Sequence, residues 1–186
     1  MNARRRGPRP GLVAVAALAV PLALAGAGED YAFMPKGGKA LLLELAGSPP
    51  EAKTLREVSQ ARRTEAEWRE FARARRPAFS ERELDTLAAY LAVHMPLAPD
   101  PPPAGDPAAA LPPDGRELAW TQCQSCHSLF TSHLTQVREV QGWRNMFLSP
   151  FHREMKMSPQ EREEFSRYSA INMPMRIEDV PPDLRF

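Results

Sequence analysis

The chain has 186 residues, and its 24 Lys and Arg side chains are nearly balanced by 23 Asp and Glu side chains. The resulting formal net charge of +1 gives no electrostatic support for binding the phosphate backbone of a nucleic acid. Only two cysteines and four histidines are present, so any metal or redox site must be built from few ligands.

Residues 1–27 have the three parts of a secretory signal peptide. Arginines stand at the start, an apolar run extends from Gly11 to Ala25, and small residues follow to residue 27. The run is shorter than the about 20 residues of a membrane span, and no cysteine follows it to accept a lipid. We expect this segment to be removed on export, with an uncleaved N-terminal anchor as the alternative. Loss of its four arginines leaves 20 basic against 23 acidic side chains, a formal charge of −3.

A proline-rich stretch divides the rest of the chain. Residues 97–112 consist mainly of Pro, Ala and Asp and show no apolar periodicity, which is typical of a semi-rigid, extended linker. They separate residues 28–96 from residues 113–186, and we expect each of these segments to form a small domain.

The apolar pattern of both segments indicates helices and almost no strands. Three capping-box sequences, in which Ser or Thr is followed three residues later by Glu, begin at Thr64, Ser80 and Ser158. The one at Ser158 also has proline at the first helical position, where proline is favoured. The fold class is therefore expected to be all-α.

Six arginines crowd residues 62–76, where they alternate with glutamates. A solvated, mixed-charge face is the first interpretation of this pattern, and a docking patch for an acidic redox partner is the second.

The second segment contains the five residues Cys123-Gln124-Ser125-Cys126-His127, which form the Cys-x-x-Cys-His attachment sequence of a c-type haem. In such a site the thiols of Cys123 and Cys126 add to the two vinyl groups of one porphyrin, and the imidazole of His127 ligates the iron. A Cys-x-x-Cys pair can also be a thioredoxin-like redox centre or half of a zinc site. The sequence shows neither a βαβ pattern nor two further ligands at metal spacing.

With this motif, and with residues 114–120 as the helix that leads into it, the second segment resembles the class I cytochrome c superfamily. The resemblance implies an all-α haem domain over residues 113–186 with one covalent haem c. It also implies attachment of the haem outside the cytoplasm, so we expect export by general secretion and a periplasmic protein.

The same family resemblance assigns roles to residues near the motif. Trp143 is expected to contact a haem propionate or the haem edge, with core packing as the alternative. His133 lies only six residues past His127 and is expected on the rim of the site. The proline whose carbonyl orients the proximal histidine in the family is missing, because the next proline is Pro150.

The two segments also resemble each other. Trp68 lies 75 residues before Trp143, and Tyr90 lies 78 residues before Tyr168. Such nearly equal offsets predict an internal duplication, with chance convergence of two helical units as the alternative. Residues 46–50, at the place of the haem motif, offer no thiol or imidazole. We therefore expect residues 28–96 to be a degenerate, haem-free cytochrome-like domain.

The ligand opposite His127 decides whether the iron carries electrons or does chemistry. In the family it is usually a methionine in the loop before the last helix, which raises the reduction potential. Met155 fits this place best, because it lies three residues before the predicted helix cap and has no methionine at the corresponding place in the first segment. The alternatives are Met157, His152, Met146 or an open position.

Together these features predict a periplasmic, single-haem cytochrome that transfers one electron at a time. The expected partner is a redox protein, either a periplasmic dehydrogenase or a terminal oxidase or reductase, and no stable membrane span is expected after cleavage of the signal. We expect no enzymatic activity. The alternatives are a haem enzyme or gas-binding cytochrome of the peroxidase or sensor type, which needs an open distal site, and a purely structural subunit.

Overall fold

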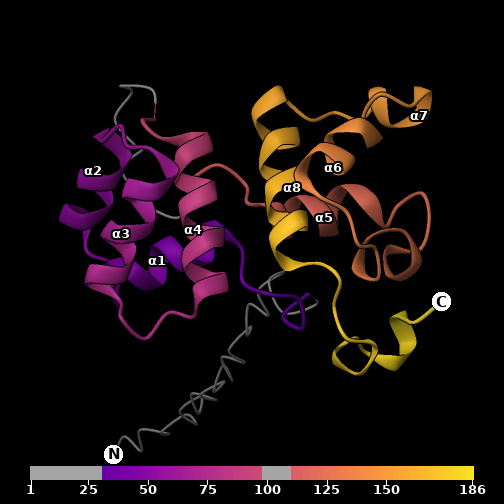
Figure 1. Cartoon of the computed structure of the whole chain (residues 1–186), viewed down its shortest axis with the longest axis horizontal. Helices are drawn as coiled ribbons and strands as arrows, with labels where there is room; N and C mark the ends of the chain where they lie inside the picture. The colour runs from indigo at the N-terminus through magenta and orange to yellow at the C-terminus, as the bar shows by residue number, and fades with distance from the viewer. Residues whose placement is uncertain (1–30, 98–109) are drawn as a thin grey trace, which may run out of the picture.

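The computed structural model describes residues 31–97 and 110–186. Every regular element in these ranges is a helix, which confirms the all-α fold class (Figure 1). The predicted signal peptide and most of the predicted linker lie outside the described residues. None of the helices in the two described ranges combines the length and the apolar character needed to cross a membrane.

Within the described ranges, each half contains four α-helices. The helices of the first half are α1 (Gly38–Ala46), α2 (Ala52–Gln60), α3 (Glu65–Arg75) and α4 (Glu81–His94). Those of the second half are α5 (Gly115–Cys123), α6 (Val140–Met146), α7 (Pro150–Arg153) and α8 (Pro159–Asn172). The second half also has a π-helical turn, η2 (Phe130–Leu134), and the short 3₁₀ turns η3 (Ile177–Asp179) and η4 (Pro182–Leu184).

Capping boxes begin the helices where the sequence predicts them. The side chains of Thr64, Ser80 and Ser158 accept hydrogen bonds from the backbone three residues on, at the starts of α3, α4 and α8. A fourth capping box, at Asp114, begins α5. Each box satisfies backbone N–H groups that the helix itself leaves without partners.

Each half has its own apolar core, with a fully buried tryptophan in it. The first core contains Leu41, Leu42, Leu45, Leu55, Val58, Trp68, Phe79, Leu84, Leu87, Tyr90, Leu91 and Met95, with small residues between them. The second core contains Leu118, Leu129, Leu134, Trp143, Phe147, Met157, Phe165, Tyr168, Met173 and Val180.

The two halves repeat the same contacts. A Cβ atom on Gly38 would lie 2.1 Å from the Cβ of Tyr90, and one on Gly115 would lie 2.1 Å from the Cβ of Tyr168. Glycine at these two places therefore lets α1 approach α4, and α5 approach α8, with no side chain between them. The contact of α1 with α4 thus resembles that of α5 with α8, and the fully buried tryptophans of α3 and α6 are a second shared feature.

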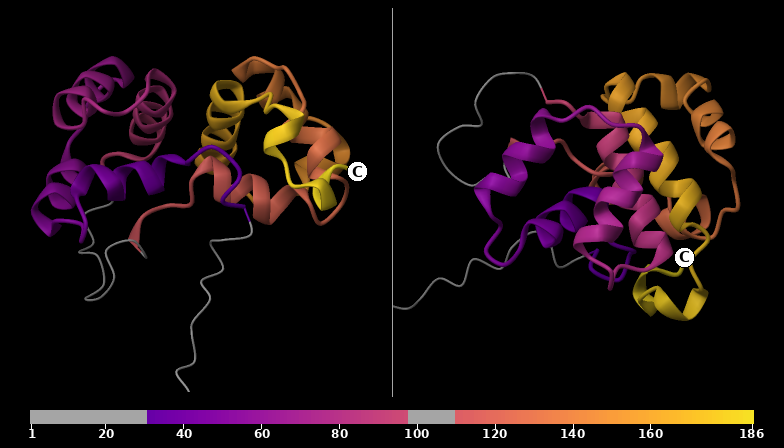
Figure 2. Two further views of the ribbon diagram at one scale, coloured as in Figure 1. Left: turned by 90° about the horizontal axis from the view of Figure 1, so that it is seen from below. Right: turned by 60° about the vertical axis from the view of Figure 1, so that its left-hand side comes forward.

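The halves pack on each other through α4 and α8, which lie side by side (Figures 1 and 2). Within this interface the buried amide Nδ2 of Asn172 donates a hydrogen bond to Oγ1 of Thr86 at 3.0 Å.

The segments that lead into α1 and α5 each reach across to the other half. Met34, ahead of α1, is 2% exposed and belongs to the second core, whereas Leu111, ahead of α5, belongs to the first. The hydroxyl of Tyr168 donates to the carbonyl of Pro35 at 2.7 Å, and the hydroxyl of Tyr90 donates to the carbonyl of Pro112 at 2.9 Å. The two expected domains are therefore interlocked, although the sequence-based boundary assigns Met34 to the first.

The carboxylate of Asp114 joins the N-termini of α1 and α5. It accepts hydrogen bonds from the backbone N–H of Glu117 at 3.0 Å and from that of Lys39 at 3.1 Å. The positive ends of two helix dipoles thus share one buried negative charge. A Cβ atom on Gly37 would lie 2.1 Å from this carboxyl group, so the shared contact requires glycine there.

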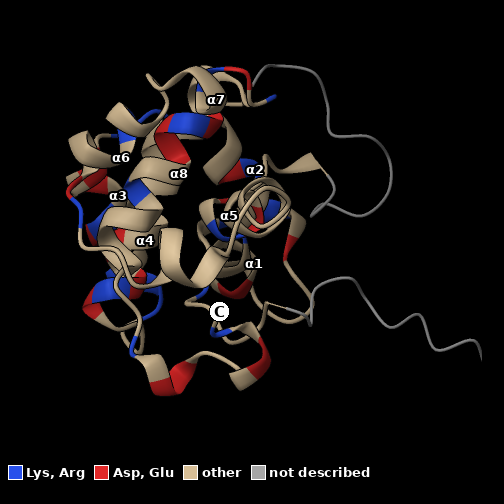
Figure 3. Cartoon of the chain, turned by 90° about the vertical axis from the view of Figure 1, so that its right-hand side faces the viewer, with Lys and Arg blue, Asp and Glu red and all other residues tan. Residues whose placement is uncertain are grey.

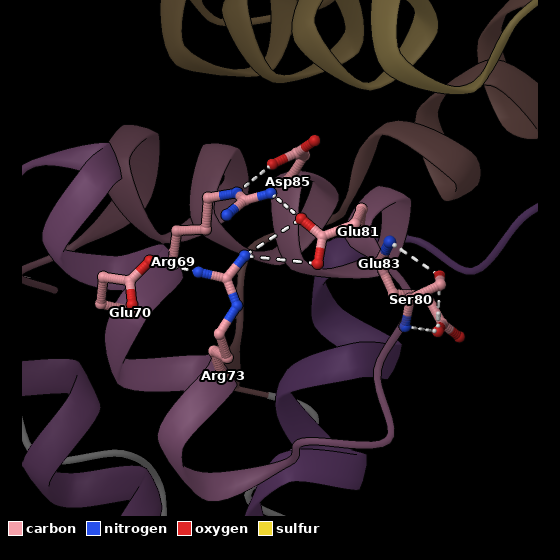
Figure 4. Close-up of polar contacts among 7 residues, drawn as sticks. All are labelled: Arg69, Glu70, Arg73, Ser80, Glu81, Glu83 and Asp85. Carbon is pink, nitrogen blue, oxygen red and sulfur yellow. Dashed lines mark hydrogen bonds and ion pairs between the residues drawn. The ribbon is translucent and has the colours of Figure 1, made fainter.

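The arginine-rich region forms ion pairs between α3 and α4 (Figure 4). Arg69 pairs with Glu81 and Asp85, and Arg73 pairs with Glu70 and Glu81. Basic and acidic segments alternate over the helices in Figure 3. This arrangement agrees with the first interpretation, a solvated face of mixed charge, and such surface pairs stabilise a fold only slightly.

Candidate functional site

The Cys-x-x-Cys-His motif lies at the end of α5. Cys123 is the last residue of this helix, and Cys126 and His127 lie in the turn that follows. Both thiols are free, Cys126 being exposed and Cys123 partly buried. Burial, together with the neighbouring Cys126, raises the pKa of the Cys123 thiol to about 12. The nucleophilic cysteine of a thioredoxin-like pair has a lowered thiol pKa, and Cys123 does not have this character.

A cavity of about 320 Å³ lies against the motif. Cys126 and His127 form part of its wall, and the remaining lining comes from α5, the turn that contains the motif, η2 and the C-terminal segment: Trp120, Gln124, Ser125, Ser128, Leu129, Phe130, Leu134, Leu184 and Phe186. Most of these side chains are apolar, and the volume falls at the low end of the roughly 300–1,000 Å³ of small-molecule sites. The contribution of Leu184 and Phe186 was missed by the sequence analysis, because it depends on the C-terminus folding back onto the motif.

His152 lies next to His127. The centroids of the two imidazole rings are 6.0 Å apart, and the ring planes meet at 80°. Nδ1 of His152 lies 2.8 Å from Oγ of Ser149, within hydrogen-bonding distance. His152 is one of the alternative ligands expected from the sequence. Ser149 is not, although a Ser-x-x-His spacing at the start of a helix could have indicated it.

The two candidate methionines pack against the second core. Met157 is 7% exposed and lies in this core, just as Phe79, 78 residues earlier, lies in the first core at 8% exposure. Met155 is partly buried against the second core, and neither Met155 nor His152 is among the residues that line the cavity. Arg162 fixes their loop by donating hydrogen bonds to the carbonyls of Met155 at 3.0 Å and Met157 at 3.2 Å.

Trp143 occupies the centre of the second core. It is fully buried, and its ring lies edge-on to those of His133 and Phe165, at centroid distances of 5.1 and 5.8 Å. Its Nε1 has no hydrogen-bond partner in the described ranges, and the same is true of Trp68 in the first half. The two tryptophans share these features, which agrees with core packing for Trp143, and its contact with a haem stays a prediction.

The expectation that His133 lies on the rim is wrong. Its side chain is 2% exposed, because η2 turns it into the second core. The Oγ of Ser169 donates to the carbonyl of Phe165 and lies 2.8 Å from Nε2 of His133, so Nε2 carries the proton that it donates to Ser169. Burial lowers the pKa of His133 to about 4, so the ring is neutral at physiological pH.

The residues present fit a covalently attached haem better than they fit zinc. In the described part of the chain, no three or more His, Cys, Asp or Glu side chains are grouped so that they could hold a metal ion. A structural zinc site needs four such ligands. Haem attachment needs two free thiols and an adjacent imidazole beside an apolar space. The motif provides the thiols and the imidazole, and Cys126 and His127, though not Cys123, line the cavity.

No protein-family model, no curated protein and no solved structure matches the chain. The function must therefore be argued from the site.

Proposed function

We propose that this chain is a periplasmic c-type cytochrome that transfers one electron at a time through a single covalent haem. The observation that supports this most directly is the pair of free thiols, Cys123 and Cys126, followed by His127 at the wall of an apolar cavity. The thiols hold the cofactor, and His127 binds its iron from one side.

A bound haem would supply the Fe(III)/Fe(II) couple, and the chain sets the conditions under which that couple works. Trp120, Phe130 and Leu134 give the cavity apolar walls, which exclude water from the cofactor. Exclusion of water disfavours the oxidation state of the haem that carries the higher charge, and so helps to set the reduction potential of the haem.

The first half is proposed to be a degenerate, haem-free copy of the same unit. Its α1, α3 and α4 correspond to α5, α6 and α8, and residues 46–50 offer no thiol or imidazole where the second half has its motif. Because Met34 and Leu111 interlock the cores, this half also supports the haem domain, and it presents a second surface to a partner.

The proposed partner is a redox protein of the periplasmic dehydrogenase or terminal oxidase or reductase class. Leu148 and Phe151 lie shortly before His152 in the sequence and are 68% and 90% exposed. Phenylalanine is enriched at protein interfaces, so we place the contact with the partner at this edge of the site. Export through the signal in residues 1–27 belongs to the same proposal.

A haem enzyme or sensor would need an open position opposite His127. His152 lies beside His127 instead, and this observation favours electron transfer over a haem enzyme or a sensor.

The test is to produce the full chain, with its signal, in a bacterial host that attaches c-type haem. The chain should carry one haem that survives denaturing electrophoresis, and its absorption spectrum should change reversibly on reduction and reoxidation. Cys123→Ser and Cys126→Ser should each weaken the covalent linkage, and the double variant should abolish it. Ser125→Ala, between the two cysteines, is the matched control and should keep the haem. An exported, folded wild type without covalent haem would refute the proposal.

A further inference from the structure

The second half has a segment that the first half lacks. α3 runs without a break from Glu65 to Arg75, but the corresponding stretch of the second half is divided into α6 and α7 (Figure 1). The offset between the halves rises from 75 at the tryptophans to 78 at the caps of α4 and α8, so three residues are added here. α7, with His152 on it, therefore belongs only to the half that carries the haem motif.

The hydroxyl of Ser149 serves His152 and not the helix. Ser149 is the N-cap residue of α7, yet its side chain makes no capping hydrogen bond and lies 2.8 Å from Nδ1 of His152. When the Nδ1–H of a histidine donates to such a hydroxyl, the hydrogen bond fixes the tautomer and orientation of the ring and leaves Nε2 as a free electron-pair donor. Metal-ligating histidines are commonly held in this way.

The separation of His127 and His152 suits a shared metal ion. A metal–imidazole bond is about 2 Å long. A five-membered ring with bonds of about 1.3 Å places each nitrogen about 1.1 Å from the ring centre. Two imidazoles bound on opposite sides of one metal ion therefore have centroids roughly 6 Å apart, and the observed value is 6.0 Å.

The rival ligands are engaged elsewhere. Met157 takes the core position that Phe79 fills in the first half, and Met146 and Met155 pack against the second core. His133 is buried with its Nε2 bonded to Ser169.

We infer that His152, positioned by Ser149, is the second axial ligand of the haem, in place of Met155. This inference rests on the proposed function, since it requires the haem at the motif. A histidine on each side stabilises Fe(III) relative to a His/Met pair, so the protein is a low-potential carrier closed to small ligands.

The experiment compares the haem-loaded full-length wild type with His152→Ala and Met155→Ala, using absorption and electron paramagnetic resonance spectra of the oxidised proteins. The wild type should be low-spin and should lack the far-red absorption band of methionine bound to Fe(III). Met155→Ala should leave both spectra unchanged. His152→Ala should become high-spin, and added imidazole should restore the low-spin spectrum.

Ser149 is a positioning residue, and its role is tested by measuring the reduction potential of the haem in Ser149 variants. Ser149→Ala should remain low-spin but shift the reduction potential, and Ser149→Thr, which keeps the hydroxyl, should restore it. A mere packing role for Ser149 would leave the potential of both variants at the wild-type value.

A wild type with the methionine band, or a Met155→Ala variant that becomes high-spin, would overturn the inference, and both readings hold even if His152→Ala fails to fold. If either of these two spectra overturns the inference, the haem is still bound, so the proposed function stands. A wild type without covalent haem would instead remove the proposed function and the inference together.

Discussion

Glu164 places a carboxyl group inside the interface of α5 and α8, where it should make the protein less stable at alkaline pH. Its side chain is 1% exposed. Oε1 accepts a hydrogen bond from the backbone N–H of Gly115 at 2.9 Å, whereas Oε2 has no partner among the described residues. Burial raises the pKa of this carboxyl to about 8, and the charge of Asp114 adds to the rise, while the Gly115 hydrogen bond and Arg167 oppose it.

The pKa determines both the sign and the size of the effect. In the unfolded chain the group titrates near 4.5, so between pH 4.5 and 8 the folded state holds a proton that the unfolded state has lost. The free energy of unfolding must therefore fall as the pH rises through this window and remain low above it. The two pKa values differ by about 3.5, which corresponds to at most about 5 kcal/mol.

Glu164→Gln keeps the shape and the acceptor oxygen but cannot ionise. The expected result is a variant about 3–5 kcal/mol more stable than the wild type at pH 9 and close to it at pH 5. Urea unfolding of the full-length protein, followed by circular dichroism at both pH values, gives these free energies. Glu154→Gln, on the exposed surface, is the control and should follow the wild type. Equal pH dependence of wild type and Glu164→Gln would refute the reasoning.

Three further predictions concern packing and charge. Gly115→Ala places a Cβ atom 2.1 Å from the Cβ of Tyr168, so the free energy of unfolding should fall by about 1–3 kcal/mol, and an unchanged melting temperature would contradict this close approach. Tyr168→Phe removes the hydrogen bond to the carbonyl of Pro35 and should cost about 1 kcal/mol in urea unfolding; no loss would mean that this hydrogen bond does not help to interlock the halves. Arg144 is the largest of the influences that lower the pKa of Glu163 to about 2. The stability that this pair provides is present above pH 4.5 and should disappear as the pH falls towards 2, and Glu163→Gln should flatten that acid limb; an acid limb as steep as that of the wild type would argue against the ion pair.

Features that depend on residues close together along the chain could be predicted from the sequence. The capping boxes at Thr64, Ser80 and Ser158 were identified correctly, because each depends on a Ser or Thr and a Glu three residues apart. The all-α class followed from the apolar period of the same stretches. The haem motif is a local pattern too. That its two thiols and its imidazole bind a haem remains a prediction, which the haem-attachment experiment tests.

Contacts between distant segments had to come from the structure. The sequence could not show that η2 turns His133 into the core, and it placed this residue on the rim. Nor could it show that Met34 joins the second core or that Glu164 becomes buried against Gly115, since both depend on how the halves and helices pack.

The sequence by itself determined the helical class, the helix starts and the chemical character of the motif, because hydrogen bonding and periodicity along one helix are local. Only the tertiary structure decided what stands beside His127. The interruption between α6 and α7 turns His152 towards that ring, whereas packing against the second core holds Met155 and Met157. Their positions depend on the summed packing of separate helices, which a spacing along the chain does not encode.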